Sequence, residues 1–223
     1  MHFSKDNHVI AIDIPGFGES SHNRTTWSMK GFGDDVNAVV KGLDVDKVVL
    51  IGFSMGAPVV IEASKKTKNL AGVILVDDIR DLTAKFSDEM IEGMKGYIND
   101  LLKDPTQEKL VAGGFFTQNL EEATAKVQAF RATNYWQEGW DSIITSYLQW
   151  YNELGASSIQ ECPVPIAMIN SDLQPMNLDY TRELVPSIHI DIVPGSGHVI
   201  MWDFPDKFNE LVEANVRRFM NNN

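Results

Sequence analysis

Short runs of β-branched and aliphatic residues alternate along this chain of 223 residues with segments whose apolar residues recur at helical spacing. Because the apolar runs are largely continuous, they indicate strands buried on both faces of a sheet. Parallel strands joined by helices produce this pattern. We therefore predict an α/β fold, a mostly parallel sheet with helices on both faces. The expected strands are 8–14, 47–53, 71–77, 164–170 and 188–194, the last more mixed and typical of an edge, and the expected helices are 29–43, 54–67 and 208–220.

Residues 80–160 interrupt this alternation. The segment contains helical patterns, among them SDEMIEGMKGYINDLLKD and WDSIITSYLQWYNEL, without a convincing strand. It is also rich in aromatic residues, which either pack between its helices or line an apolar pocket. We predict a helical insertion at 80–160 within a core formed by 1–79 and 161–223.

The charge of the chain limits its partners. It carries 31 acidic residues against 19 Lys and Arg, a formal net charge of −12. This argues against nucleic acid or an anionic membrane as partner, because phosphate binding needs clustered basic residues. The start, MHFSKDNHVIAIDIPG, lacks the basic and then apolar order of a signal peptide, and no apolar stretch is long enough to span a membrane. The lone Cys162 excludes an internal disulfide. We expect a soluble, cytoplasmic protein.

The stretch VVLIGFSMGAPVV, residues 48–60, places Ser54 in a Gly-x-Ser-x-Gly frame between an expected strand and an expected helix. A serine hydroxyl is a weak nucleophile that needs exposure, a neighbouring base and backbone N–H groups to stabilise an oxyanion. A sharp strand-to-helix turn supplies this geometry, and we expect Gly52 and Gly56 to relieve the crowding at it. We predict that Ser54 is a nucleophile, and the alternative is an ordinary serine in a tight turn.

A serine nucleophile needs a base. His198 is the candidate, because it follows the last expected strand on the Gly-rich turn of PGSGHVIM and can reach across the sheet, whereas His189 lies within that strand. A third residue must accept the imidazole N–H. We rank Asp172, just past a strand in MINSDLQP, first, and the pair Asp77 and Asp78 at the end of AGVILVDD second.

Four stretches together resemble successive landmarks of the α/β-hydrolase superfamily: VIAIDIPGFGES, LIGFSMGAPVV, CPVPIAMINSD and VPGSGHVIMWDFPDKF. The resemblance implies Ser54 as the nucleophile, Asp172 as the acid and His198 as the base, with the Met55 N–H as one oxyanion donor. It also makes the helical insertion a cap. The acid is the loosest match, because the superfamily commonly has Gly-x-x-Asp where this chain has INSD.

The chain departs from this pattern at its start. Members of the superfamily normally carry further strands and a His-Gly loop before the segment that resembles HVIAIDIPG, and that loop normally gives the second oxyanion donor. One of those strands also lies between the strands that match 8–14 and 47–53. We therefore expect these two strands either to pair directly or to leave a gap. Weak activity and self-association into a homo-oligomer through an exposed edge would follow.

The leading predicted function is hydrolysis of a small carboxylic ester or related acyl compound through an acyl-enzyme on Ser54, without metal or organic cofactor. Perhydrolase or haloperoxidase-like activity uses the same triad and stays open. A non-catalytic α/β-hydrolase-like binding protein is a third interpretation, which the intact set of serine, acid and histidine disfavours.

Overall fold

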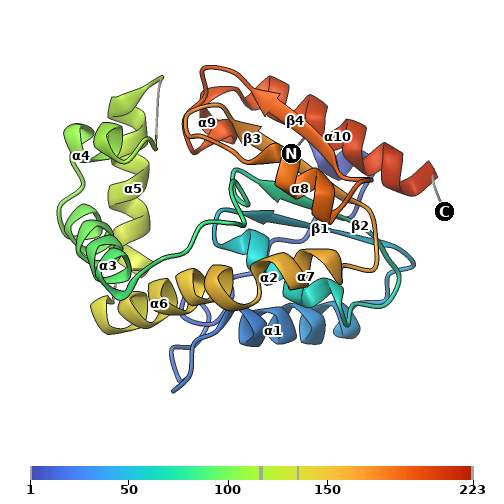
Figure 1. The fold of residues 1–223 in the computed structure, drawn as a ribbon, viewed down its shortest axis with the longest axis horizontal. Coiled ribbons are helices and arrows are strands. Elements are labelled where there is room, and N and C mark those ends of the chain that lie inside the picture. The colour runs from blue at the N-terminus through green and yellow to red at the C-terminus, as the bar shows by residue number, and fades with distance from the viewer. Residues whose placement is uncertain (1, 116–117, 135, 222–223) are drawn as a thin grey trace.

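A parallel sheet of four strands lies at the centre of the molecule (Figure 1). The computed structural model describes residues 2–115, 118–134 and 136–221. The strands are hydrogen-bonded in the order in which they occur in the sequence, so their carboxyl ends share one edge of the sheet. They are β1 (Val48–Phe53), β2 (Leu70–Val76), β3 (Ile166–Ser171) and β4 (His189–Val193). The expected α/β architecture is confirmed, and β4 lies at an edge, as its mixed sequence predicts.

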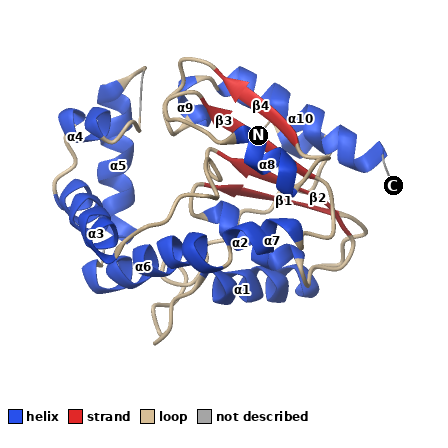
Figure 2. Cartoon of the chain, viewed as in Figure 1, coloured by secondary structure: helices blue, strands red, loops and turns tan. Residues whose placement is uncertain are grey.

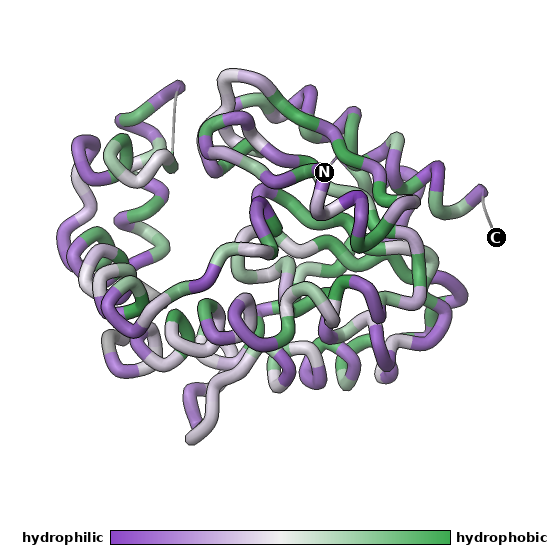
Figure 3. Tube along the Cα trace, in the orientation of Figure 1, coloured by the Kyte–Doolittle hydropathy of each residue, from purple (hydrophilic) through white to green (hydrophobic). Residues whose placement is uncertain are grey.

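Helices cover both faces of this sheet (Figure 2). They include α1 (Met29–Gly42) and α2 (Gly56–Ser64) on one face, and α9 (Ile200–Asp203) and α10 (Pro205–Asn221) on the other. Successive side chains of β2 enter different cores, because Val73 and Leu75 pack with the α1 and α2 side while Ile74 and Val76 pack with the α10 side. Burial on both faces explains why the strand has no polar alternation, and Figure 3 shows the hydrophobic strands in the interior.

The segment between β2 and β3 is helical, as expected. It forms α3 (Asp88–Lys103), α4 (Gln107–Ala112), α5 (Leu120–Asn134), α6 (Gln137–Glu153) and α7 (Gly155–Gln160). Ser87 and Thr106 accept hydrogen bonds from backbone N–H groups in the first turns of α3 and α4, which explains where those helices begin. Figure 1 shows α3, α4 and α5 to one side of the sheet, with α6 leading back towards it. The division into core and cap stays a prediction. Two short helices complete the described chain, η1 (Phe3–Lys5) and α8 (Leu178–Leu184).

The segment 8–14 is not a strand, which corrects that expectation. Its backbone is irregular, and Val9, Ile10 and Ile12 are exposed. Within the described chain β1 is the edge strand opposite β4, and its Ile51 is 46% exposed. Both arrangements that we expected needed a strand at 8–14, so neither is found. A strand needs a neighbour to pair its backbone N–H and C=O groups, and high β propensity alone does not supply one.

Candidate active site

Ser54 occupies a strained turn directly after β1. Its backbone φ of 51° lies in the left-handed region, which non-glycine residues rarely adopt. The turn is fixed because the Ser54 N–H donates to the Val76 carbonyl (2.9 Å) and the Ser54 carbonyl accepts from the Ala57 N–H (2.8 Å). Backbone strain of this kind is typical of functional sites and presents the hydroxyl at the carboxyl edge of the sheet.

The two glycines of the turn have different roles. A Cβ on Gly52 would lie 2.2 Å from the Gly56 carbonyl oxygen, so this position requires glycine. A Cβ on Gly56 would meet nothing within 4 Å. The expectation that both glycines relieve crowding is therefore right for Gly52 and wrong for Gly56, where the start of α2 leaves open space.

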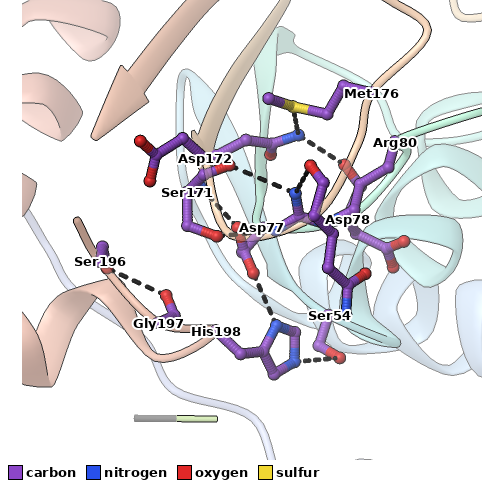
Figure 4. A network of polar contacts seen from close by, with 12 residues as sticks. Ser54, Asp77, Asp78, Arg80, Ser171, Asp172, Met176, Ser196, Gly197 and His198 are labelled. Carbon is purple, nitrogen blue, oxygen red and sulfur yellow. Dashed lines mark hydrogen bonds and ion pairs between the residues drawn. The ribbon is translucent and has the colours of Figure 1, made fainter. Parts of the chain in front are cut away.

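His198 reaches Ser54 from the loop after β4. Its Nε2 lies 3.0 Å from the Ser54 Oγ (Figure 4). The His198 N–H donates to the Gly114 carbonyl (3.0 Å), and the ring packs against Phe53 and Phe115, at 4.8 and 5.3 Å between ring centroids. Gly114 and Phe115, which follow α4, thus help to hold the imidazole, and the structure brings together the two residues whose pairing we expected.

The carboxylate that contacts His198 belongs to Asp77, and our ranking of the two acid candidates is corrected accordingly. The Asp77 Oδ2 lies 2.7 Å from the His198 Nδ1 (Figure 4). Asp172 is exposed, and its Oδ1 accepts instead from the Gly195 N–H at 2.8 Å. The second-ranked pair therefore contained the residue that completes the chain of hydrogen bonds.

Strand order explains why Asp77 holds this position. β2 is the direct neighbour of β1, with Val76 paired to Phe53, so the residue after β2 lies beside Ser54. β3, which precedes Asp172, is one strand farther away. Asp77 also has a positive φ of 49°, which turns the chain sharply at the end of the strand. Two aspartates directly after a largely buried strand were the signal, but the sequence did not reveal which strand neighbours the serine.

Asp77 is held in its ionised form. Burial by itself would raise the pKa of this carboxyl group, but hydrogen bonds from His198 and from the Ser171 N–H, together with the charge of Arg80, outweigh burial and lower the pKa below its ordinary value. The Ser171 N–H donates to Asp77 Oδ1 at 2.6 Å, so both carboxylate oxygens are engaged. An ionised, oriented acid is what a catalytic imidazole requires.

Asp78, the next residue, points into a different polar cluster. Its carboxylate accepts from the hydroxyl groups of Tyr147 and Tyr151 on α6 and from the Ile79 N–H. Burial raises the pKa of Asp78 to about 6, although the hydrogen bonds from Tyr151, Ile79 and Tyr147 oppose that rise. Burial also raises the pKa values of both tyrosines well above their ordinary value. The cluster connects the carboxyl end of β2 to α6.

This cluster predicts a pH dependence of stability. The folded-state pKa of Asp78 is raised from 3.8, so the folded protein binds the proton more tightly than the unfolded chain, and stability falls as pH rises from about 4 through 6. The difference between these two pKa values corresponds to about 3 kcal/mol. We expect Asp78→Asn to remove this decline, measured as the free energy of unfolding in urea between pH 4 and 7. Asp46→Asn, at an exposed aspartate, should keep the wild-type slope, and parallel curves for wild type and Asp78→Asn would contradict the prediction.

Met55 lies directly before α2, at the end of the helix where backbone N–H groups lack intrahelical partners. Its role as an oxyanion donor stays a prediction.

The turn after segment 8–14 is closed on itself, because the N–H groups of Gly16, Phe17, Glu19 and Ser20 donate to acceptors between residues 13 and 21. This turn is also joined to the helical segment between β2 and β3, since the Trp136 Nε1 donates to the Gly16 carbonyl at 3.0 Å. In this arrangement those four N–H groups are occupied within the turn.

The described part of the chain lacks two features, a metal-binding cluster and a membrane-spanning helix. Across residues 2–115, 118–134 and 136–221, no group of three or more His, Cys, Asp or Glu side chains is placed to hold a metal ion. None of the helices over the same ranges combines the length and the apolar character needed to cross a membrane.

The structure combines a parallel sheet, a serine on the strained turn after one strand, and a histidine that follows the last strand and forms a hydrogen bond with that serine. This combination defines the α/β-hydrolase class. The chain belongs to the alpha/beta hydrolase family, whose sequence model matches residues 2–211. The superfamily resemblance found in the sequence is thereby confirmed.

Solved structures of other proteins share this fold. An N-acyl homoserine lactone degrading enzyme matches with a TM-score of 0.72 and 20% identity, over 95% of this chain and 84% of that chain. A thermophilic esterase from Thermogutta terrifontis matches with a TM-score of 0.70 and 18% identity, over 92% and 78%. A bromoperoxidase from Bacillus anthracis matches with a TM-score of 0.73 and 20% identity, over 91% and 79%. At these identities the likeness concerns the fold.

Proposed function

We propose that this protein is a serine hydrolase that cleaves a carboxylic ester or a related acyl compound through an acyl-enzyme on Ser54. The observation that carries the proposal is the continuous chain of hydrogen bonds from the Ser54 Oγ through both nitrogens of His198 to Asp77, with distances of 3.0 and 2.7 Å. Membership of the alpha/beta hydrolase family and the fold shared with esterases support it.

In the proposed reaction the Ser54 Oγ attacks the carbonyl carbon of the substrate while the His198 Nε2 takes the hydroxyl proton. The developing oxyanion is stabilised by the Met55 N–H at the start of α2. The tetrahedral intermediate collapses, the C–O bond to the leaving alcohol breaks, and His198 returns the proton to that alcohol. Water then attacks the acyl-enzyme with His198 as base, which releases the acid and restores Ser54. Asp77 fixes the imidazole tautomer and stabilises its charged form throughout.

A second candidate function shares the first steps of this reaction, up to the acyl-enzyme. Hydrogen peroxide can replace water as the attacking group on the acyl-enzyme, which gives a peracid in place of a carboxylic acid. The fold shared with a bromoperoxidase favours keeping this perhydrolase or haloperoxidase-like activity as the alternative. Peracid formation from an ester and hydrogen peroxide, compared with hydrolysis of the same ester without peroxide, distinguishes the two.

A fluorophosphonate probe tests the proposal directly, because it reacts with activated serines and mimics the tetrahedral intermediate. We expect one covalent label on the wild-type protein by intact mass spectrometry and none on Ser54→Ala. Ser157→Ala is the matched control, since this exposed hydroxyl on α7 bonds only locally to the Leu154 carbonyl, and it should label like wild type. An unlabelled wild-type protein would favour the non-catalytic binding protein, and a labelled Ser54→Ala would place the nucleophile elsewhere.

A further inference from the structure

Arg80 shares the Asp77 carboxylate with His198. The Arg80 Nη2 lies 2.6 Å from Asp77 Oδ1, while Asp77 Oδ2 lies 2.7 Å from the His198 Nδ1. The Asp77 side chain is fully buried, and that of Arg80 is 15% exposed. A guanidinium ion therefore holds one oxygen of the proposed catalytic acid and the imidazole holds the other. Arg80 belongs to none of the sequence motifs described above.

The guanidinium group is itself fixed by the neighbouring strand. Its Nη2 also donates to the Ser171 Oγ (2.8 Å), and its Nη1 donates to the carbonyls of Ser171 (3.2 Å) and Gln174 (3.3 Å). The Ser171 N–H donates to the same oxygen of Asp77 that Arg80 holds. Several bonds to one planar group leave it little freedom to rotate. Arg80 therefore connects the acid after β2 to the end of β3.

We propose that Arg80 is a positioning residue that orients the Asp77 carboxylate towards His198 and, through its charge, shapes the pH dependence of the reaction. This inference rests on the proposed function. Without Arg80, Asp77 Oδ1 keeps only the Ser171 N–H, and the carboxylate gains freedom to turn away from the imidazole. Displacements of about 1 Å in a catalytic group lower turnover by roughly 10²-fold.

The charge of Arg80 acts in a second way. A positive charge beside Asp77 helps to lower the pKa of that carboxyl group, and it opposes the second positive charge that the imidazole carries when it holds the serine proton. The other charged groups around Asp77 and His198 are acidic: Asp78 from the same turn, Asp172 from the loop after β3, and Asp203 of α9, which accepts from the Gly197 N–H. Among the described residues, Arg80 is therefore the cation in contact with the site.

Three variants separate orientation from charge. Arg80→Met removes both, Arg80→Lys keeps the charge but not the planar fork, and Arg217→Met removes one positive charge from an exposed site on α10. The readouts are kcat and KM for a short p-nitrophenyl ester across pH 5 to 9, with thermal melts for each variant. We expect Arg80→Met to lower kcat by roughly 10- to 100-fold with little change in KM. We also expect the acidic limb of its pH–rate profile to move up by roughly one unit.

Arg80→Lys should lose part of kcat and keep the acidic limb near its wild-type position, and Arg217→Met should match wild type in both. A wild-type protein that reacts with the fluorophosphonate probe, together with an unchanged kcat and pH profile in Arg80→Met, would overturn this inference and leave the proposed function intact. An unreactive wild-type protein would overturn both. If Arg80→Met does not fold, Arg80→Lys decides: a lower kcat at an unchanged melting temperature supports the inference, and full activity overturns it.

Discussion

Ser54→Ala and His198→Ala are each expected to lower kcat for short p-nitrophenyl esters by at least about 10⁴-fold. The physical reason is that the two groups act on one proton, and their 3.0 Å contact means that neither is useful without the other. For the same reason the double variant should be no slower than the slower single variant. Initial rates over a range of substrate concentrations measure this, with circular dichroism to show that each variant folds.

His189→Ala is the matched control for His198→Ala. This histidine is the first residue of β4, and its Nε2 lies 3.2 Å from the Asp191 Oδ1. The contact with Ser54 is made by His198, so His189 takes no part in it. It should keep activity within a few-fold of wild type. Retention of more than a few per cent of activity by folded Ser54→Ala or His198→Ala would contradict the assignment of both residues.

Asp77→Asn is expected to lower kcat by on the order of 10⁴-fold, whereas Asp172→Asn should lower it less than about tenfold. An asparagine at 77 presents an N–H group or a neutral oxygen to the His198 Nδ1, so the imidazole loses the partner that fixes its tautomer and stabilises its charge. An asparagine at 172 still has a side-chain oxygen that can accept from the Gly195 N–H, the contact seen in the structure.

The two substitutions are matched in size and chemistry, so the comparison depends only on position. Activity should be measured at the pH optimum, with thermal melts because the Asp77 side chain is buried and Asp172 is exposed. The reverse order of effects would show that the loop after β3 carries the acid during turnover and that the contact between Asp77 and His198 is structural.

Much of the fold followed from local sequence patterns. Continuous apolar runs gave the four observed strands within a residue or two of their ends, and helical spacing gave α1, α2 and α10. The failure at 8–14 has a specific cause. Its residues have strand propensity, but a strand forms only where a neighbouring backbone accepts its hydrogen bonds, and the neighbour is set by the whole sheet.

The site shows the same division between local and tertiary information. Ser54 and His198 were found from the sequence because each lies in a short glycine-containing turn whose local geometry exposes the side chain. The strand order decided between Asp77 and Asp172, because the acid must reach the imidazole across the carboxyl edge of the sheet, and only the pairing of β1 with β2 puts Asp77 there. Arg80 became significant for the same reason. Its contact with Asp77 is local, three residues along the chain, but its contacts with the end of β3 join residues 91 positions apart. Contacts at that separation arise from packing of the chain and leave no local pattern in its sequence.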